Sequence, residues 1–204
     1  MAIETVIHDY TLEDAYHIVF YGKTNWLSGV HYMGVPISKL PLDLWIMQEI
    51  VWETRPEVIV ETGTWCGGSA LFYAHLLEMV GREPRNGPTR PPTVISIDNL
   101  WLHNTRLDGG FEGHTPYPEH PYIQYIEGDS VDPETVEQVH RLAAGRRTMV
   151  VLDSSHTCTH VAQEMKAYRD MVAEGCYMVV EETNYPLIFK EIEAEPLDAI
   201  GLLL

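Results

Sequence analysis

The stretch from Val58 to Ala70 reads V-I-V-E-T-G-T-W-C-G-G-S-A and decides the fold of this chain. A β-branched apolar run meets Glu61, and a loop with glycines at positions 63, 67 and 68 leads into an apolar run of helix-forming residues. This pattern predicts a strand, a tight turn and the start of a helix. Open parallel sheets bind nucleotide-like cofactors at such junctions, because glycines let a ligand approach the backbone and the helix N-terminus presents free N–H groups.

The glycine spacing narrows the choice of ligand. It is not G-x-G-x-x-G, and no Lys follows in the P-loop pattern, so dinucleotide binding and P-loop nucleotide binding are both disfavoured. The loop is closer to the E-x-G-x-x-x-G loop of class I methyltransferases. A purely structural turn with no ligand is the alternative at this point.

Length and composition set further bounds. The 204 residues, 45% of them hydrophobic, are enough for one α/β domain, and we expect an N-terminal cap over residues 1–56 and the main domain over residues 57–204. The formal charge of −17, with 13 basic residues, argues against a nucleic-acid partner and against an acidic membrane surface. Cys66, Cys158 and Cys176 have no paired spacing and no targeting segment is visible, which indicates a cytoplasmic protein with reduced thiols.

Strand and helix patterns alternate along the rest of the chain. Further strands are expected at residues 93–98, 122–126, 148–153 and 176–180, and helices at 41–53, 70–81, 132–144 and 156–173, after a short amphipathic helix within residues 1–25. This alternation requires parallel pairing with right-handed crossovers. Residues 26–41 are expected to form an aromatic loop that covers a pocket or a subunit contact, and residues 99–121 a lid or binding loop.

Acidic residues stand at or near the ends of the predicted strands. Glu61, Asp98, Asp153 and Glu181 do so, and Asp129 lies two residues beyond the third strand. Because parallel strands end at one edge of a sheet, this edge is the expected binding face. Asp98 is placed to accept hydrogen bonds from ribose hydroxyls, although capping of the next helix is an equally common role for such a residue.

Asp153, Glu181 and Glu182 are candidate ligands of a divalent cation. Neighbouring carboxylates repel one another unless a cation lies between them, and an all-oxygen set suits Mg²⁺, with Ca²⁺ or Mn²⁺ as alternatives. A solvated surface pair is the alternative interpretation of the two glutamates. His156, three residues after Asp153, could reach the same site as a neutral base, and His160 is the weaker candidate.

The chain resembles the cephalosporin hydroxylase / rhamnosyl O-methyltransferase family of S-adenosylmethionine-dependent enzymes. The resemblance covers about residues 26–183 and is carried by GVPISKLPLDLW (34–45), QEIVWETRP (48–56), ETGTWCGGSA (61–70), ID (97–98), EGDS (127–130), LDSSHT (152–157) with His160-Val161, and VVEET (179–183). It implies an α/β, Rossmann-like class I methyltransferase fold over residues 57–204, with a parallel sheet of order 3-2-1-4-5 and flanking helices.

The resemblance also implies the roles of individual residues. It implies a magnesium site at Asp153, Glu181 and Glu182, with Asp153 and His156 as catalytic residues and His156 as the general base. It implies a pocket for S-adenosylmethionine formed by Glu61, Gly63, Gly67, Gly68, Ser69, Asp98, Asp129 and Ser130.

The chain departs from the family pattern in two places. The usual acid pair after the fifth strand is Glu-Asp, so Glu182 is one methylene longer than the family's second acid. Relatives continue with a final β-hairpin, which is expected to be shortened or missing here.

The reaction expected from these residues is methyl transfer to a hydroxyl of a small molecule. The metal would lower the pKa of the attacking hydroxyl and His156 would accept its proton, which favours a sugar diol, a catechol or a hydroxy-carbonyl acceptor. A hydroxylase is an alternative, but the sequence shows no two-His-one-carboxylate iron site and no flavin or haem motif. An accessory, non-catalytic subunit and an N-methyltransferase are further alternatives. The aromatic arm before the first helix of the main domain favours a homo-oligomer.

Overall fold

The computed structural model describes residues 11–23, 30–81, 90–99, 117–183 and residue 200. Its centre is a sheet of five parallel strands in the order β5-β4-β3-β6-β7. These strands are β3 (Val58–Thr62), β4 (Thr93–Asp98), β5 (Ile123–Glu127), β6 (Thr148–Leu152) and β7 (Met178–Val180). Numbered from β3 as the first strand, the order is 3-2-1-4-5, which confirms the predicted topology.

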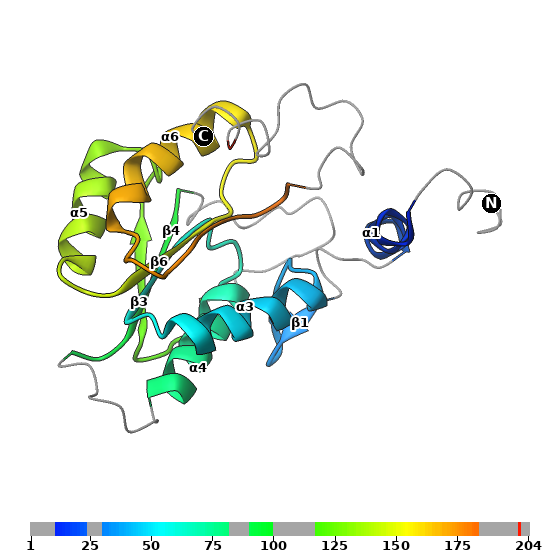
Figure 1. Ribbon diagram of the computed structural model, residues 1–204, viewed down its shortest axis with the longest axis horizontal. Coiled ribbons are helices and arrows are strands. Elements are labelled where there is room, and N and C mark those ends of the chain that lie inside the picture. The colour runs from blue at the N-terminus through cyan, green and yellow to red at the C-terminus, as the bar shows by residue number, and fades with distance from the viewer. Residues whose placement is uncertain (1–10, 24–29, 82–89, 100–116, 184–199, 201–204) are drawn as a thin grey trace.

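Helices cover both faces of the sheet (Figure 1). One face carries α3 (Pro41–Thr54) and α4 (Gly68–Gly81), and the other carries α5 (Pro133–Ala143) and α6 (Cys158–Tyr168). Side chains of a strand point alternately to the two faces. Ile59 accordingly packs in the core under α3 and α4, whereas its neighbours Val58 and Val60 pack in the core under α5 and α6. The continuous apolar run of β3 thus fits a strand that is buried on both faces.

A short antiparallel hairpin precedes α3, where the sequence predicts only a loop. It consists of β1 (His31–Tyr32) and β2 (Val35–Pro36), joined by Met33 and Gly34 with φ values of 50° and 84°. Two consecutive residues with positive φ are typical of the tight turns that match the twist of a hairpin. Tyr32 fixes the hairpin to α4, because its ring meets Phe72 edge-on with centroids 5.2 Å apart. The hairpin therefore packs against α4, and residues 37–40 connect it to α3.

The boundaries of the last helix differ from the prediction. Helix α6 begins at Cys158 with Thr157 as its N-cap residue, and it is followed by a short 3₁₀-helix, η3 (Arg169–Met171). His156 therefore lies in the loop before the helix. The amphipathic helix of the N-terminal region is α1 (Leu12–Lys23), which lies to one side of the sheet in Figure 1.

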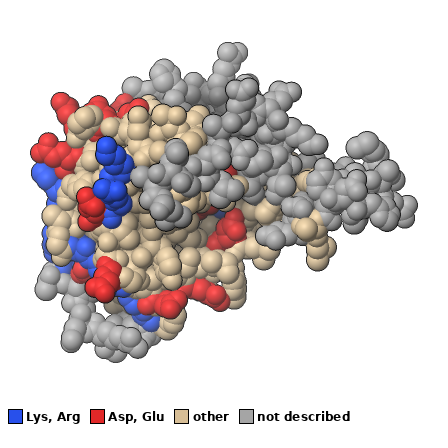
Figure 2. Space-filling model, turned by 45° about the horizontal axis from the view of Figure 1, so that its top comes forward, with Lys and Arg blue, Asp and Glu red and all other residues tan. Residues whose placement is uncertain are grey.

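Parts of the predicted loops and of the C-terminal region lie outside the described residues, namely 100–116, 184–199 and 201–204. The predicted loss of a final hairpin falls there. Among the described helices, none has the length and apolar character needed to cross a membrane. Among the described side chains on the face shown in Figure 2, acidic and basic groups are interspersed and form no continuous basic surface of the kind that binds nucleic acid.

Candidate active site at the carboxyl edge of the sheet

A cavity of about 500 Å³ lies at the carboxyl ends of the central strands. The loops after β3, β4, β5 and β6 line it, together with Ile37, Ser38 and Lys39 from the segment between the hairpin and α3. Most of the residues predicted for the site are on its wall: Gly63, Gly68, Ser69, Asp98, Asp129, Ser130, Asp153, His156 and Glu182. Glu61, Gly67 and Glu181 are not.

The loop after β3 is held by two neighbouring strands. The backbone N–H groups of Thr64 and Trp65 donate to Oδ2 of Asp98, at 3.0 and 2.8 Å. Gly63 has φ +85°, and a Cβ at this position would overlap the carbonyl group of Asp153. The loop predicted to bind the donor therefore packs directly on the residue predicted to act on the acceptor, and Gly63 is required for this close approach.

Glu61 lies beneath the cavity, inside β3. Its side chain is completely buried, and Ser96 Oγ donates to its Oε2 at 2.7 Å while its Oε1 has no hydrogen-bond partner. Burial raises the pKa of Glu61 to about 7. Ser96 in turn contacts Thr64 of the loop, since the two hydroxyls are 2.7 Å apart, so the Glu61 carboxyl group supports the loop through these two residues. The predicted contact of Glu61 with a cofactor stays a prediction.

Gly67 also lies behind the wall of the cavity. It has φ +78°, and a Cβ here would lie 2.7 Å from Cδ of Pro118 and 3.1 Å from the hydroxyl of Tyr125. The glycine is thus needed for packing of the loop against the segment before β5. Its predicted role in cofactor binding is not tested by this position.

The predicted metal ligands meet a lysine. Lys39 Nζ donates to Oδ2 of Asp153 at 2.6 Å and lies 3.0 Å from Oε1 of Glu181. The Lys39 side chain is only 5% exposed, and those of the two acids 16% and 12%. Burial opposes the charge of Lys39, but the two carboxylates raise its pKa well above the ordinary value. The position between the two acids is therefore occupied by an ammonium group.

Glu182 stands next to this ion pair on the wall of the cavity. Its backbone has φ 58°, and its Oε2 is buried without a hydrogen-bond partner. Burial and, second, the charge of Asp153 raise the pKa of Glu182 to about 8. Within the described part of the chain, no group of three or more His, Cys, Asp and Glu side chains is arranged to hold a metal ion. The three-ligand metal site remains a prediction.

His156 lines the cavity beside Asp153. Burial and the positive charge of Lys39 lower its pKa, so the imidazole is neutral at neutral pH. A neutral imidazole can accept a proton, which is the property required of a general base.

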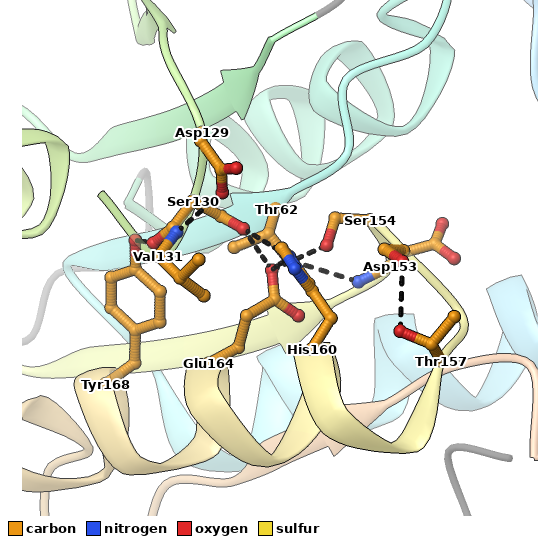
Figure 3. A network of polar contacts seen from close by, with 11 residues as sticks. Thr62, Asp129, Ser130, Val131, Asp153, Ser154, Thr157, His160, Glu164 and Tyr168 are labelled. Carbon is orange, nitrogen blue, oxygen red and sulfur yellow. Dashed lines mark hydrogen bonds and ion pairs between the residues drawn. The ribbon is translucent and has the colours of Figure 1, made fainter. Parts of the chain in front are cut away.

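A buried polar network joins the two halves of the cavity (Figure 3). Glu164 on α6 is completely buried, and its Oε1 accepts from Ser130 Oγ at 2.5 Å and from Ser154 Oγ at 2.6 Å. Nε2 of His160 lies 3.0 Å from the same Ser130 hydroxyl, and Tyr168 donates to the Ser130 carbonyl. Glu164 therefore connects Ser130, on the predicted donor side, to Ser154, the neighbour of Asp153.

Sequence reasoning missed Lys39 and Glu164 as parts of the site. A signal for Glu164 exists, because it shares the buried register of α6 with Val161 and Tyr168. An acidic residue at such a position needs partners. Lys39 belongs to the segment GVPISKLPLDLW (34–45), but its partner Asp153 is 114 positions away and nothing local indicates the pair.

A family model described as "Rhamnosyl O-methyltransferase/CmcI" matches residues 24–196. The rhamnosyl O-methyltransferase of Mycobacterium tuberculosis (strain ATCC 25618 / H37Rv) is 32% identical over 173 residues, which cover 84% of this chain and 63% of that protein. The rhamnosyl O-methyltransferase of Mycobacterium leprae (strain TN) is 31% identical over 195 residues, covering 93% of this chain and 76% of that protein. The chain thus spans about 63% of the length of the Mycobacterium tuberculosis relative.

Solved structures share the fold. The structure described as "cmcI-D160 Mg-SAM" has a TM-score of 0.60 at 20% identity and covers 96% of this chain and 74% of that one. The "CmcI-N160 apo-structure" has a TM-score of 0.58 at 21% identity, with coverage of 96% and 75%. "MycE Methyltransferase from the Mycinamycin Biosynthetic Pathway in Complex with Mg and SAH" has a TM-score of 0.51 at 17% identity, and covers 78% of this chain and 38% of that one. These likenesses establish a class I methyltransferase fold.

Proposed function

Because the chain belongs to the rhamnosyl O-methyltransferase/CmcI family, we propose that it transfers a methyl group from S-adenosylmethionine to a hydroxyl of a small molecule. The acceptor is a sugar or another natural-product intermediate. The observation that carries the proposal is a single cavity with the predicted donor residues Asp98 and Ser130 and the predicted acceptor residues Asp153 and His156 on its wall.

The donor half of the cavity suits a positively charged nucleoside. Gly68 and Ser69 form the first turn of α4, where free backbone N–H groups can meet a carboxylate. Asp98 and Asp129 supply acceptors for hydroxyl groups, and an acid-rich cavity favours a sulfonium cation. The solved relatives described with SAM or SAH support the choice of donor.

The acceptor half fits a hard cation. Asp153 and Glu181 already hold one cation, the ammonium of Lys39, and Glu182 has a buried oxygen without a partner. We therefore propose that Asp153, Glu181 and Glu182 would hold Mg²⁺, with Ca²⁺ or Mn²⁺ as substitutes. The ion, when bound, would supply Lewis acidity that lowers the pKa of the acceptor hydroxyl. Solved relatives described with Mg support this assignment.

His156 completes the proposed reaction. Its neutral imidazole accepts the proton of the acceptor hydroxyl while the hydroxyl oxygen attacks the methyl carbon. The S–CH₃ bond breaks, its electron pair stays on sulfur, and S-adenosylhomocysteine leaves. The walls of the cavity hold donor and acceptor in line, which is a large part of the rate enhancement expected for such a transfer.

Calorimetry with S-adenosylhomocysteine tests the donor half of the proposal. The wild type should bind it, and Asp153→Asn should bind it equally well but lose methyl transfer to a panel of sugar diols and catechols. Asp170→Asn, in an exposed position of η3, is the matched control and should keep both properties. No binding by the wild type would favour an accessory subunit, and full turnover in EDTA would remove the metal from the proposal.

We also propose that the chain forms a homo-oligomer through α3. Leu42, Trp45, Ile46 and Trp52 are 60%, 64%, 52% and 54% exposed, and their spacing places them on one side of the helix. An apolar stripe of this kind is typical of an association surface. Sedimentation should show a dimer or larger species for the wild type and a smaller one for Trp45→Glu; a monomeric wild type would contradict the proposal.

We propose that the protein acts in the reducing environment of the cytoplasm, because its cysteines are free thiols. Cys66, Cys158 and Cys176 are all free and partly buried. Burial and the charge of Asp98 raise the pKa of Cys66 to about 11, so this thiol stays protonated and unreactive.

A further inference from the structure

Lys39 stands where a metal ion would have to bind. Its Nζ is 2.6 Å from Asp153 Oδ2 and 3.0 Å from Glu181 Oε1, and its side chain is almost completely buried. A divalent ion bound to the same oxygens would lie about 2.1 Å from them, and therefore within about 5 Å of the Lys39 nitrogen. Two cations this close repel each other strongly in a buried site. The ammonium and a divalent ion thus compete for the same pair of carboxylates.

A second hollow offers the lysine another place. It has a volume of about 300 Å³, adjoins the acids, and is lined by Lys39, Asp43, Glu181 and Glu182 among others. Asp43 lies in the first turn of α3, four residues after Lys39, and is exposed. Its carboxylate gives the ammonium an alternative partner on the solvent side of the site.

We infer that Lys39 is a built-in counter-ion of the acceptor-side acids, and that a divalent ion binds Asp153 and Glu181 only when the Lys39 ammonium has left them. The inference rests on the proposed function for the assignment of these acids as metal ligands. Lys39 then weakens metal binding, because its ammonium has to leave the acids first. It also stabilises the metal-free protein, because the buried acids are paired with a cation in the absence of metal. Lys39 is thus a positioning residue that acts through Asp153 and Glu181.

Mn²⁺ titrations of the wild type, Lys39→Met and Lys39→Arg, followed by electron paramagnetic resonance, test the competition. Lys39→Met should bind Mn²⁺ at least tenfold more tightly than the wild type, whereas Lys39→Arg, which keeps the charge, should not bind it more tightly. Lys166→Met is the matched control, since Lys166 is exposed on α6, and should bind Mn²⁺ as the wild type does. Equal or weaker binding by Lys39→Met would overturn the inference.

A measurement on the unaltered protein guards against a variant that fails to fold. Amine acetylation followed by peptide mass spectrometry should label Lys39 several times faster at saturating Mn²⁺ than in EDTA, with Lys166 as the internal reference. Unchanged labelling at saturating Mn²⁺ overturns the inference. If neither the wild type nor Lys39→Met binds Mn²⁺, the inference is overturned as well. Binding of S-adenosylhomocysteine to the same samples decides separately whether the donor part of the proposed function stands.

Discussion

Replacing Gly63 with alanine tests the close packing between the donor loop and the end of β6. Gly63 has φ +85°, and a Cβ here would overlap the carbonyl oxygen of Asp153, lie 2.7 Å from its carbonyl carbon and 3.0 Å from Cα of Ser154. Ordinary contacts between carbon and a carbonyl oxygen are about 3.3–3.6 Å. The atoms in the way belong to the backbone, so either the loop or the strand end must move by roughly 1.5 Å.

The expected loss of stability has two parts. A left-handed backbone conformation costs alanine about 1–2 kcal/mol, and overpacking of a close contact adds about 1–3 kcal/mol. Gly145 provides the control, because it has φ +70° and an added Cβ would meet nothing within 4 Å. Gly145→Ala should therefore lower the free energy of unfolding by about 1–2 kcal/mol, and Gly63→Ala by about 2–5 kcal/mol.

Urea unfolding and calorimetry measure the two effects. In addition to the larger loss of stability, Gly63→Ala should bind S-adenosylhomocysteine about tenfold more weakly, which corresponds to about 1.4 kcal/mol. Gly145→Ala should bind it as the wild type does, because its site is remote from the cavity wall. Equal stabilities and equal affinities of the two variants would refute the packing described for Gly63.

Three further predictions follow from buried titratable groups. Glu61→Gln should flatten the pH dependence of stability, because the folded protein keeps the Glu61 proton up to about pH 7. In urea unfolding the wild type should lose roughly 2.5 kcal/mol more than the variant as pH rises from 5 to 8, and equal losses would contradict the burial of Glu61. The rate of methyl transfer should fall on acidification with a midpoint below pH 6.5, because burial and the charge of Lys39 lower the pKa of His156. His156→Ala should lower the rate by about 10²–10⁴-fold and remove this acidic decrease from the pH–rate profile. Glu164→Gln should lower the free energy of unfolding by about 1.5–3 kcal/mol and weaken S-adenosylhomocysteine binding through Ser130, whereas the exposed Glu137→Gln should change neither.

The sheet could be predicted because its sequence signals are local. β3 begins with the apolar residues Val58, Ile59 and Val60 and is followed by a glycine loop. Helix α5 starts one residue after Asp132, whose side chain accepts from the backbone of Glu134. The β1–β2 hairpin could not be predicted in this way. Its strands have two residues each, and Tyr32 is held by contacts with Phe72 on a helix far along the chain.

The site could be predicted to the extent that it follows from topology. Asp98 ends a parallel strand, and Asp129 and Asp153 follow closely after two others, so their places on one edge are fixed by the order of the sheet. Glu61 differs because it lies inside β3 opposite Ser96, and its side chain is enclosed by the neighbouring strand. Lys39 gives no local sign of its partners, and only the folded chain shows that its charge meets Asp153 and Glu181.

Residues 37–39 contribute to the cavity from outside the predicted main domain. If the chain is divided at residue 56, as the sequence predicts, the sheet and the donor loops belong to the main domain. One wall of the cavity, and Lys39 with the charge that pairs with its acids, belong to the N-terminal part. Exchange of residues 37–39 between relatives would alter the shape of the acceptor side and the strength of cation binding in one step. New acceptor preferences could therefore arise without any change in the strands that hold the donor.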